Sequence, residues 1–202
     1  MKPSHPIRCA CGKFRAALAH PELGTRAVCY CRDSQAFAHF LGLPPGMLDA
    51  AGGTEVVAVG PRSVTFIAGV EHLACMSLTP QGTLRWYAAC CKTPIGNTPR
   101  DPAQYHVGLI RNCLEGVGID LAETFGPVKM RVNRRGAKHR VEPVPRHMFV
   151  AAAAGYMASV TWARVSGRYR TNPFFKPGLA GPLVEPKVLG GSEYAALMRT
   201  VE

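Results

Sequence analysis

The chain has 202 residues, a formal net charge of +11, a hydrophobic fraction of 47% and a charged fraction of 18%. This length allows one domain with an extension, or two small domains. The high apolar and low charged fractions argue against a disordered chain. The 21 glycines and 17 prolines favour short strands joined by turns over long helices.

The first motif along the chain is Cys9-Ala10-Cys11-Gly12, which is typical of a metal knuckle because its glycine frees the backbone where amides point at sulfur. Residues 13–20 and 26–31 are predicted to be strands, and the second of them carries Cys29 and Cys31. A short helix is expected over residues 35–43, before Pro44-Pro45-Gly46.

A series of short strands follows, separated by glycine and proline turns, and indicates an antiparallel sheet system. The strands are expected at residues 55–59, 63–68, 72–79, 83–89 and 105–111. Cys90 and Cys91 end the fourth of these, and residues 93–99 are predicted to be an irregular loop. The fold class predicted from the pattern is therefore mainly β, with a first domain over residues 1–125.

Residues 126–202 are predicted to be a basic, partly helical extension. Residues 127–176 contain eleven Lys and Arg and one acid, Glu142, which gives a local charge of +10. A helix is expected over residues 147–166, and a last short helix with Ser192 as its N-cap. Such charge indicates an anionic partner, nucleic acid or anionic lipid; the alternative is a solvated segment that keeps the protein soluble.

Residues 1–14 contain no apolar run that could serve as a signal peptide. Clustered thiols without such a signal indicate a reducing, cytoplasmic location and metal binding rather than disulfides. The longest uncharged stretch, residues 148–163, is shorter than the roughly 20 residues of a membrane-spanning helix, so no transmembrane segment is expected.

Six of the eight cysteines lie in three tight clusters. Structural zinc prefers four thiolates from two short turns. We expect one zinc site at Cys9, Cys11 and Cys91, with Cys90 either as the fourth ligand or leaning toward Cys29 and Cys31. The alternative is that the cysteines are small buried apolar residues.

The order of these motifs resembles the superfamily of the glutathione-dependent formaldehyde-activating enzyme and centromere protein V, which has the zinc-bearing β-tent fold. The matching residues are Cys9, Cys11 and Gly12, then Cys29 and Cys31, then Arg85-Trp86-Tyr87 before Cys90-Cys91. The resemblance covers roughly residues 7–110, and residues 36–42 and 90–98 are similar to an uncharacterised bacterial branch. It implies a β-tent-like fold with one structural zinc and often a second, reactive zinc at the middle cysteines.

The chain departs from this superfamily at two motifs. Ser34 stands where the middle motif has its third cysteine, and the last motif, Cys-x-x-Cys-Gly in the enzymes, is Ala88-Ala89-Cys90-Cys91-Lys92. A serine hydroxyl is a poor zinc ligand, so Asp33, His39, Cys75 or Cys90 would have to complete a second site. Cys29, Cys31 and Ser34 are the candidate catalytic residues; the alternative is that Cys29 and Cys31 are a vestigial or redox-active thiol pair.

Two functions follow as hypotheses. In the first, the resemblance implies a carbon–sulfur lyase that acts on glutathione–aldehyde adducts, with zinc as cofactor and glutathione or another small thiol as partner. In the second, the protein is a non-enzymatic zinc-stabilised module that binds nucleic acid or an anionic membrane through residues 127–176.

Overall fold

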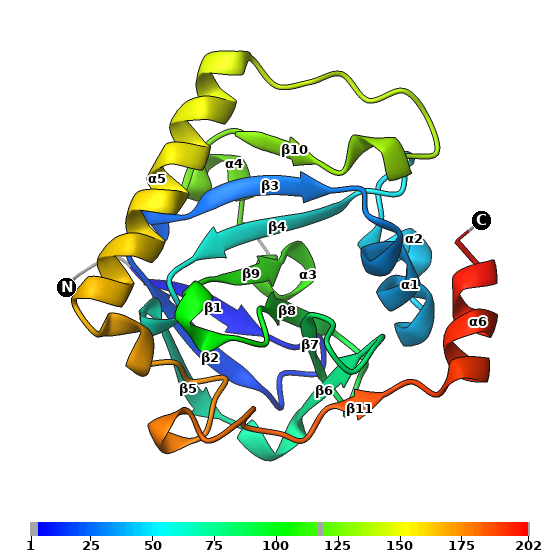
Figure 1. Cartoon of the computed structure of the whole chain (residues 1–202), viewed down its shortest axis with the longest axis horizontal. Coiled ribbons are helices and arrows are strands. Elements are labelled where there is room, and N and C mark those ends of the chain that lie inside the picture. Colours follow the sequence, from blue (N-terminus) through cyan, green and yellow to red (C-terminus); the bar gives the residue numbers. More distant parts are fainter. Residues whose placement is uncertain (1–3, 117–118, 202) are drawn as a thin grey trace.

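The computed structural model describes residues 4–116 and 119–201, and β-strands dominate the body of the molecule (Figure 1). A three-stranded antiparallel sheet has the order β1-β2-β5, with β1 at Ser4–Arg8, β2 at Arg15–Ala19 and β5 at Val64–Ala68. This sheet forms one wall of the core.

An eight-stranded sheet forms the other wall, in the order β10-β3-β4-β9-β8-β7-β6-β11. Its strands are β3 Thr25–Cys29, β4 Thr54–Val59, β6 Leu73–Ser77, β7 Leu84–Ala88, β8 Pro94–Thr98, β9 Val107–Ile110, β10 Met130–Val132 and β11 Lys187–Val188. The six central strands pair antiparallel, whereas the edge strands β10 and β11 pair parallel with β3 and β6. The predicted mainly β fold class with a partly helical C-terminal part is confirmed.

Helices lie around the sheets. They are α1 Arg32–Leu41, α2 Pro44–Met47, α3 Arg111–Leu114, α4 Leu121–Phe125, α5 Arg146–Val165 and α6 Gly191–Arg199. Single 3-10 turns occur at Pro21–Leu23, Pro61–Ser63, Val70–His72, Pro102–Gln104, Arg134–Gly136, Pro177–Leu179 and Arg168–Arg170. No helix within residues 4–116 and 119–201 combines the length and the apolar character needed to cross a membrane.

The main core lies between the two sheets and is closed by an aromatic cluster. Trp86 on β7 is fully buried, and its indole N–H donates to Thr98 Oγ1 on β8 at 2.9 Å. The ring of Phe174 lies 5.2 Å from Trp86 and 5.1 Å from Phe66 on β5, measured between centroids. The C-terminal part therefore contributes an apolar anchor to the core, as well as the strands β10 and β11.

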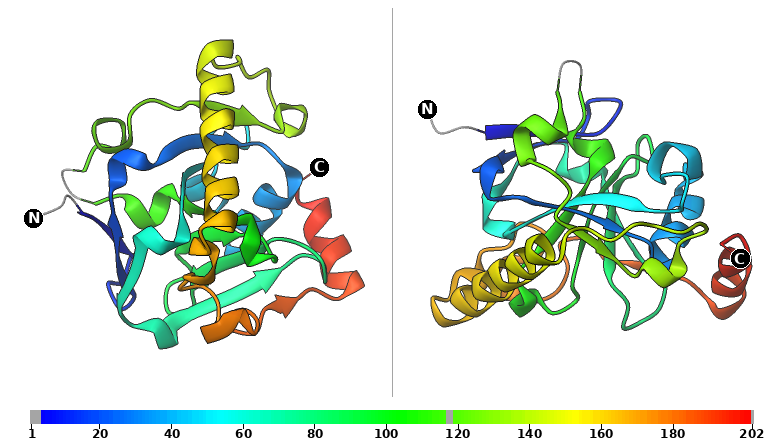
Figure 2. Two further views of the ribbon diagram at one scale, coloured as in Figure 1. Left: turned by 60° about the vertical axis from the view of Figure 1, so that its left-hand side comes forward. Right: turned by 90° about the horizontal axis from the view of Figure 1, so that it is seen from above.

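The helix α5 runs along one edge of the molecule, on the opposite side from α6 (Figures 1 and 2). Ala152, Ala153, Tyr156, Val160 and Ala163 share one less exposed helical face, as the sequence pattern predicts, and Ala163 is buried. Phe149, expected on the same face, is 38% exposed. Its opposite face is open. The division of the chain at residue 125 stays a prediction.

The structure departs from the prediction at the strands β8 and β1. Residues 94–98 are the central strand β8 and not a loop: Pro94 sits at an irregularity of the β7–β8 pairing, and a side chain at Gly96 would approach Gly108 O to 3.0 Å. Glycine and proline mark a bulge and a close backbone approach here, although they are also loop signals. The edge strand β1 was not predicted, because Pro6 weakens its strand pattern.

The bounds of two helices also shift. Helix α1 begins at Arg32 rather than residue 35, so Cys31 is its N-cap, and it ends at Gly42, which adopts the left-handed φ of 73°. The last helix begins after Gly190 rather than Ser192, because the Glu193 carboxylate accepts a hydrogen bond from the Gly190 N–H at 3.2 Å.

Candidate functional site

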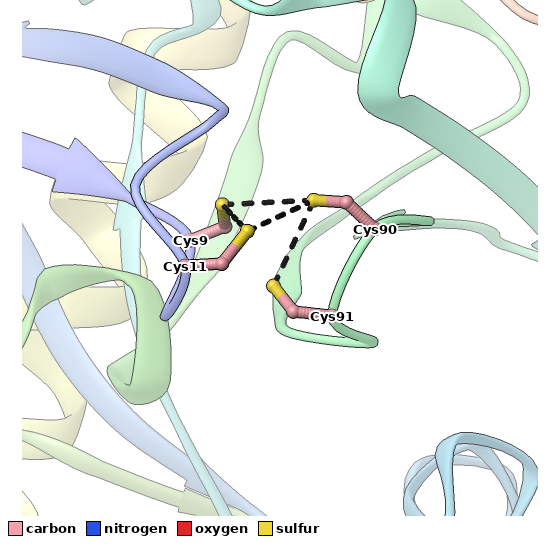
Figure 3. A group of neighbouring side chains, drawn as sticks. All are labelled: Cys9, Cys11, Cys90 and Cys91. Atoms are coloured by element: carbon pink, nitrogen blue, oxygen red, sulfur yellow. Dashed lines mark hydrogen bonds between the residues drawn. The ribbon is translucent and has the colours of Figure 1, made fainter.

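Two loops from different sheets bring four cysteines together (Figure 3). Cys9 and Cys11 lie between β1 and β2, and Cys90 and Cys91 lie between β7 and β8. The four Sγ atoms all lie within 4.8 Å of one another. They form the one group of three or more His, Cys, Asp or Glu ligands found within the described ranges.

The distances between the sulfurs fit one tetrahedral ion. At a Zn–S length of about 2.3 Å, the edge of a regular tetrahedron of sulfurs is about 3.8 Å. The Sγ atoms are 3.5 Å apart for Cys9 and Cys11, 3.9 Å for Cys9 and Cys90, 3.3 Å for Cys11 and Cys90, and 3.8 Å for Cys90 and Cys91. This cluster can therefore hold a metal ion with small side-chain adjustments.

The local backbone explains how each loop presents two sulfurs. Gly12 has φ of 76°, which turns the chain back so that the Phe14 N–H donates to Cys9 Sγ at 3.3 Å. Lys92 has φ of 59° and its N–H bonds to Ala88 O at 2.8 Å, closing a tight turn around Cys90 and Cys91. This turn lets two adjacent cysteines face the same point.

Hydrogen bonds from both loops act on Cys91. Burial raises the pKa of its thiol, but the Thr93 hydroxyl and the main-chain N–H groups of Cys11 and Thr93 lower that pKa to about 6. Desolvation and hydrogen bonds with Cys11 and Cys91 raise the pKa of Cys90 to about 12. A metal ion would displace the protons that these thiols share.

A second pair of thiols lies at the end of β3. Cys29 and Cys31 have their Sγ atoms 3.2 Å apart, and Ser34 Oγ lies 3.1 Å from Cys31 Sγ. Asn133, directly after β10, donates from Nδ2 to Cys29 Sγ at 3.4 Å. Cys90 lies with Cys9 and Cys11, so it does not lean toward this pair.

The buried Arg85 supplies positive charge beside this pair. It is 4% exposed, and its guanidinium carbon lies 5.6 Å from the centre of the Phe37 ring. Its Nη2 lies 3.9 Å from the half-exposed Asp33 carboxylate, and its Nη1 donates to Asn97 Oδ1 at 3.4 Å. Burial lowers the pKa of Arg85, and the nearby charges of Cys31, Asp33 and Cys29 oppose that shift.

The two middle thiols share a proton. The hydrogen bond between the two sulfurs lowers the pKa of Cys29 to about 5, and the same bond raises the pKa of Cys31. The Asn133 amide also stabilises the anion on Cys29. The two thiols therefore titrate as one pair.

An open pocket of about 750 Å³ adjoins these thiols. It is lined by Cys31, Arg32, Asn133, Arg134, Arg135 and Gly136. The Gln35 amide fixes this wall, donating from Nε2 to Gly136 O at 2.8 Å and to Tyr30 O at 3.2 Å. Part of the basic segment thus forms the rim of a thiol pocket.

The comparisons with known proteins place the chain in a family. The sequence model of the family described as "Family of unknown function (DUF6151)" matches residues 1–185. The chain belongs to DUF6151. No curated protein matches it. A crystal structure of a Rhodobacter sphaeroides protein aligns with a TM-score of 0.41 and 16% identity, over 63% of this chain and 99% of that one.

Sequence reasoning assigned no role to two polar residues of this DUF6151 protein, Arg85 and Asn133. Arg85 lies in a strand whose five residues are all buried, so a charged residue within the apolar run Leu84–Ala88 was the available signal. No pattern in the sequence brings Asn133 to Cys29, because the contact depends on the parallel pairing of β10 with β3.

Proposed function

We propose that this DUF6151 protein holds one structural zinc ion on the thiolates of Cys9, Cys11, Cys90 and Cys91. The observation that carries the proposal is that the four Sγ atoms lie within 4.8 Å of one another. Four thiolates in tetrahedral arrangement suit zinc or iron, and zinc is the usual ion of closed structural sites.

The position of the cluster supports a structural role. One loop belongs to the three-stranded sheet and the other to the eight-stranded sheet, and Cys9 and Cys90 are 81 residues apart. An ion there closes a long loop and ties the two sheets together. Four protein ligands leave no open position for a substrate.

Metal analysis of the purified full-length chain tests the proposal. We expect about one zinc per chain, which is the content of a single four-thiolate site. A folded chain that contains no metal, or that contains iron and not zinc, would overturn it.

The resemblance to the formaldehyde-activating superfamily implies a zinc-dependent lyase site at the middle cysteines. We propose that Cys29, Cys31 and Ser34 bind no second zinc in the wild type, and that carbon–sulfur lyase activity on glutathione adducts is weak or absent. Among the described residues, no third Cys, His, Asp or Glu joins this pair within ligand distance. Formation or cleavage of S-hydroxymethylglutathione at an enzymatic rate would contradict this.

A second candidate function is binding to an anionic membrane through α5, as part of a basic extension over residues 126–202. Of the eight large hydrophobic side chains exposed among the described residues, five lie on α5: Phe149, Val150, Met157, Trp162 and Val165. The helix has 20 residues and no acid, with Arg146 and Arg164 at its ends. Apolar side chains flanked by arginines suit a lipid surface better than nucleic acid.

Sedimentation with vesicles tests this candidate. The full chain should bind vesicles rich in phosphatidylserine, bind phosphatidylcholine vesicles weakly, and lose binding as salt rises. A double variant, Met157→Ser with Val165→Ser, should bind several-fold more weakly because less apolar area is buried in lipid. Equal binding by this variant, or binding to duplex DNA alone, would overturn the candidate.

A further inference from the structure

We propose that Cys29 and Cys31 are a redox-active dithiol, which an anionic low-molecular-weight disulfide oxidises to an intrachain disulfide. This inference concerns the middle thiols and does not depend on the zinc site.

The two sulfurs are placed to react with each other. Their Sγ atoms are 3.2 Å apart and both side chains are partly exposed. A disulfide bond is about 2.05 Å long, so the sulfurs need to approach by little more than 1 Å. Cys75 and Cys113, in contrast, are buried.

The groups around the pair suit thiol exchange better than metal coordination. The third neighbour is the Ser34 hydroxyl, 3.1 Å from Cys31 Sγ, and not a thiolate, imidazole or carboxylate. Asn133 donates to Cys29 Sγ at 3.4 Å. The buried guanidinium of Arg85 is near both thiols, and its Nη2 lies 3.9 Å from the Asp33 carboxylate. Donors and a nearby cation stabilise the thiolate that attacks or leaves in each exchange step.

The pocket identifies the class of co-reactant. Arg32, Arg134 and Arg135 line it, and no acidic residue of the described part of the chain does. Its volume of about 750 Å³ lies in the range of small-molecule sites. A small disulfide that carries carboxylates therefore fits both the charge and the size of the pocket.

Cys31 lines the pocket, so it reacts with the external disulfide first, once its proton has passed to Cys29 Sγ, 3.2 Å away. Its sulfur attacks one sulfur of the co-reactant, and the S–S bond breaks to release the first small thiol. Cys29 then attacks Cys31 Sγ and releases the second. The dithiol loses two electrons and two protons, and the external disulfide gains both and leaves as two thiols.

Peptide mapping of the full-length, metal-loaded protein tests the proposal. The protein is incubated with dithiodipropionate, which is a dicarboxylate, or with cystamine, a diamine of similar size. Free thiols are then alkylated under denaturing conditions and the chain is cut with trypsin. Each cysteine cluster has its own tryptic peptide: residues 27–32 contain Cys29 and Cys31, residues 9–13 contain Cys9 and Cys11, and residues 86–92 contain Cys90 and Cys91.

After dithiodipropionate, peptide 27–32 should carry neither label and should be two hydrogen masses lighter than the unlabelled, reduced peptide. Dithiothreitol should reverse the change. Its oxidation should be about tenfold slower with cystamine, because the arginines repel a cation. The double variant Arg134→Gln with Arg135→Gln should reduce that preference. In Cys29→Ser, the mixed disulfide should accumulate on Cys31.

Two results would overturn the proposal. Retention of both labels on peptide 27–32 in oxidising buffer would refute the dithiol couple. Equal rates with the dicarboxylate and the diamine would refute the anionic co-reactant. Zinc is measured on the same sample, so a missing structural metal is recognised separately from a failure of the middle thiols to oxidise.

Discussion

The main-chain N–H of Ala10 donates a hydrogen bond to Thr93 Oγ1 at 2.9 Å, across the gap between the two cysteine loops. The same hydroxyl lies 3.1 Å from Cys91 Sγ and is placed to donate to it. Thr93 is buried, so water cannot replace these bonds. One side chain therefore holds the loops in register and polarises a candidate metal ligand.

Replacing Thr93 by Val should weaken metal binding by about 10- to 100-fold, since groups that hydrogen-bond to a ligand affect affinity to that extent. Valine keeps the shape of threonine but neither accepts from Ala10 nor donates to Cys91. Competition with a chromophoric chelator measures the affinity.

Thr98→Val is the matched control. Thr98 Oγ1 accepts from the Trp86 indole at 2.9 Å in the core between the sheets. We expect this variant to lose about 1–3 kcal/mol of stability, because it leaves a buried donor without a partner, with no change in metal affinity. Equal metal affinities for both variants would show that Thr93 does not act on the cluster.

Cys11→Ser should remove most of the bound metal and lower the unfolding temperature, because metal binding energy in such sites is folding energy. Cys11 is exposed, so the substitution itself removes little packing. Cys75→Ala, which alters a buried cysteine outside the cluster, should keep the metal. Metal analysis with calorimetry makes the comparison, and a Cys11→Ser protein with wild-type metal content would exclude Cys11 as a ligand.

Ser34→Cys should raise the metal content by about one equivalent per chain, since a third thiolate beside Cys29 and Cys31 would complete a zinc site. The Ser34 Oγ atom already lies 3.1 Å from Cys31 Sγ, close to the spacing that ligands of one ion need. Metal analysis of the wild type and the variant side by side measures the number of ions per chain in each. A wild type that already holds two zinc ions would revive the lyase hypothesis.

Alkylation of Cys29 should persist to lower pH than that of an ordinary cysteine. Its pKa is lowered from 9.0 to about 5, first by the hydrogen bond with Cys31, so the reactive thiolate is lost only as pH falls through about 5. Asn133→Ala should move this midpoint upward, because the anion loses a donor. Iodoacetamide labelling of peptide 27–32 across pH measures both midpoints, and a midpoint near that of a free thiol would contradict the account.

The sequence predicts those parts of the fold that depend on local signals. Alternating apolar residues between glycine and proline turns indicate most strands, and the helix over residues 147–166 follows from its apolar face. The same signals fail at β8, where Pro94 and Gly96 serve a bulge and a close strand contact. Long-range pairing decides whether such residues form a strand or a loop.

The candidate site shows the same limit. The clustering of Cys9, Cys11 and Cys91 is expected from motif spacing, and the structure brings Cys90 to them through a tight turn at Lys92. Their role as metal ligands stays a prediction. The contact of Asn133 with Cys29 depends on the pairing of β10, which three residues of sequence cannot indicate.

Zinc-edge X-ray absorption on the purified full-length protein tests the four-thiolate site, because it counts the ligand atoms around the ion. We expect one zinc per chain with four sulfur neighbours at about 2.3 Å. A spectrum dominated by nitrogen or oxygen neighbours, or a folded protein without bound metal, would contradict it.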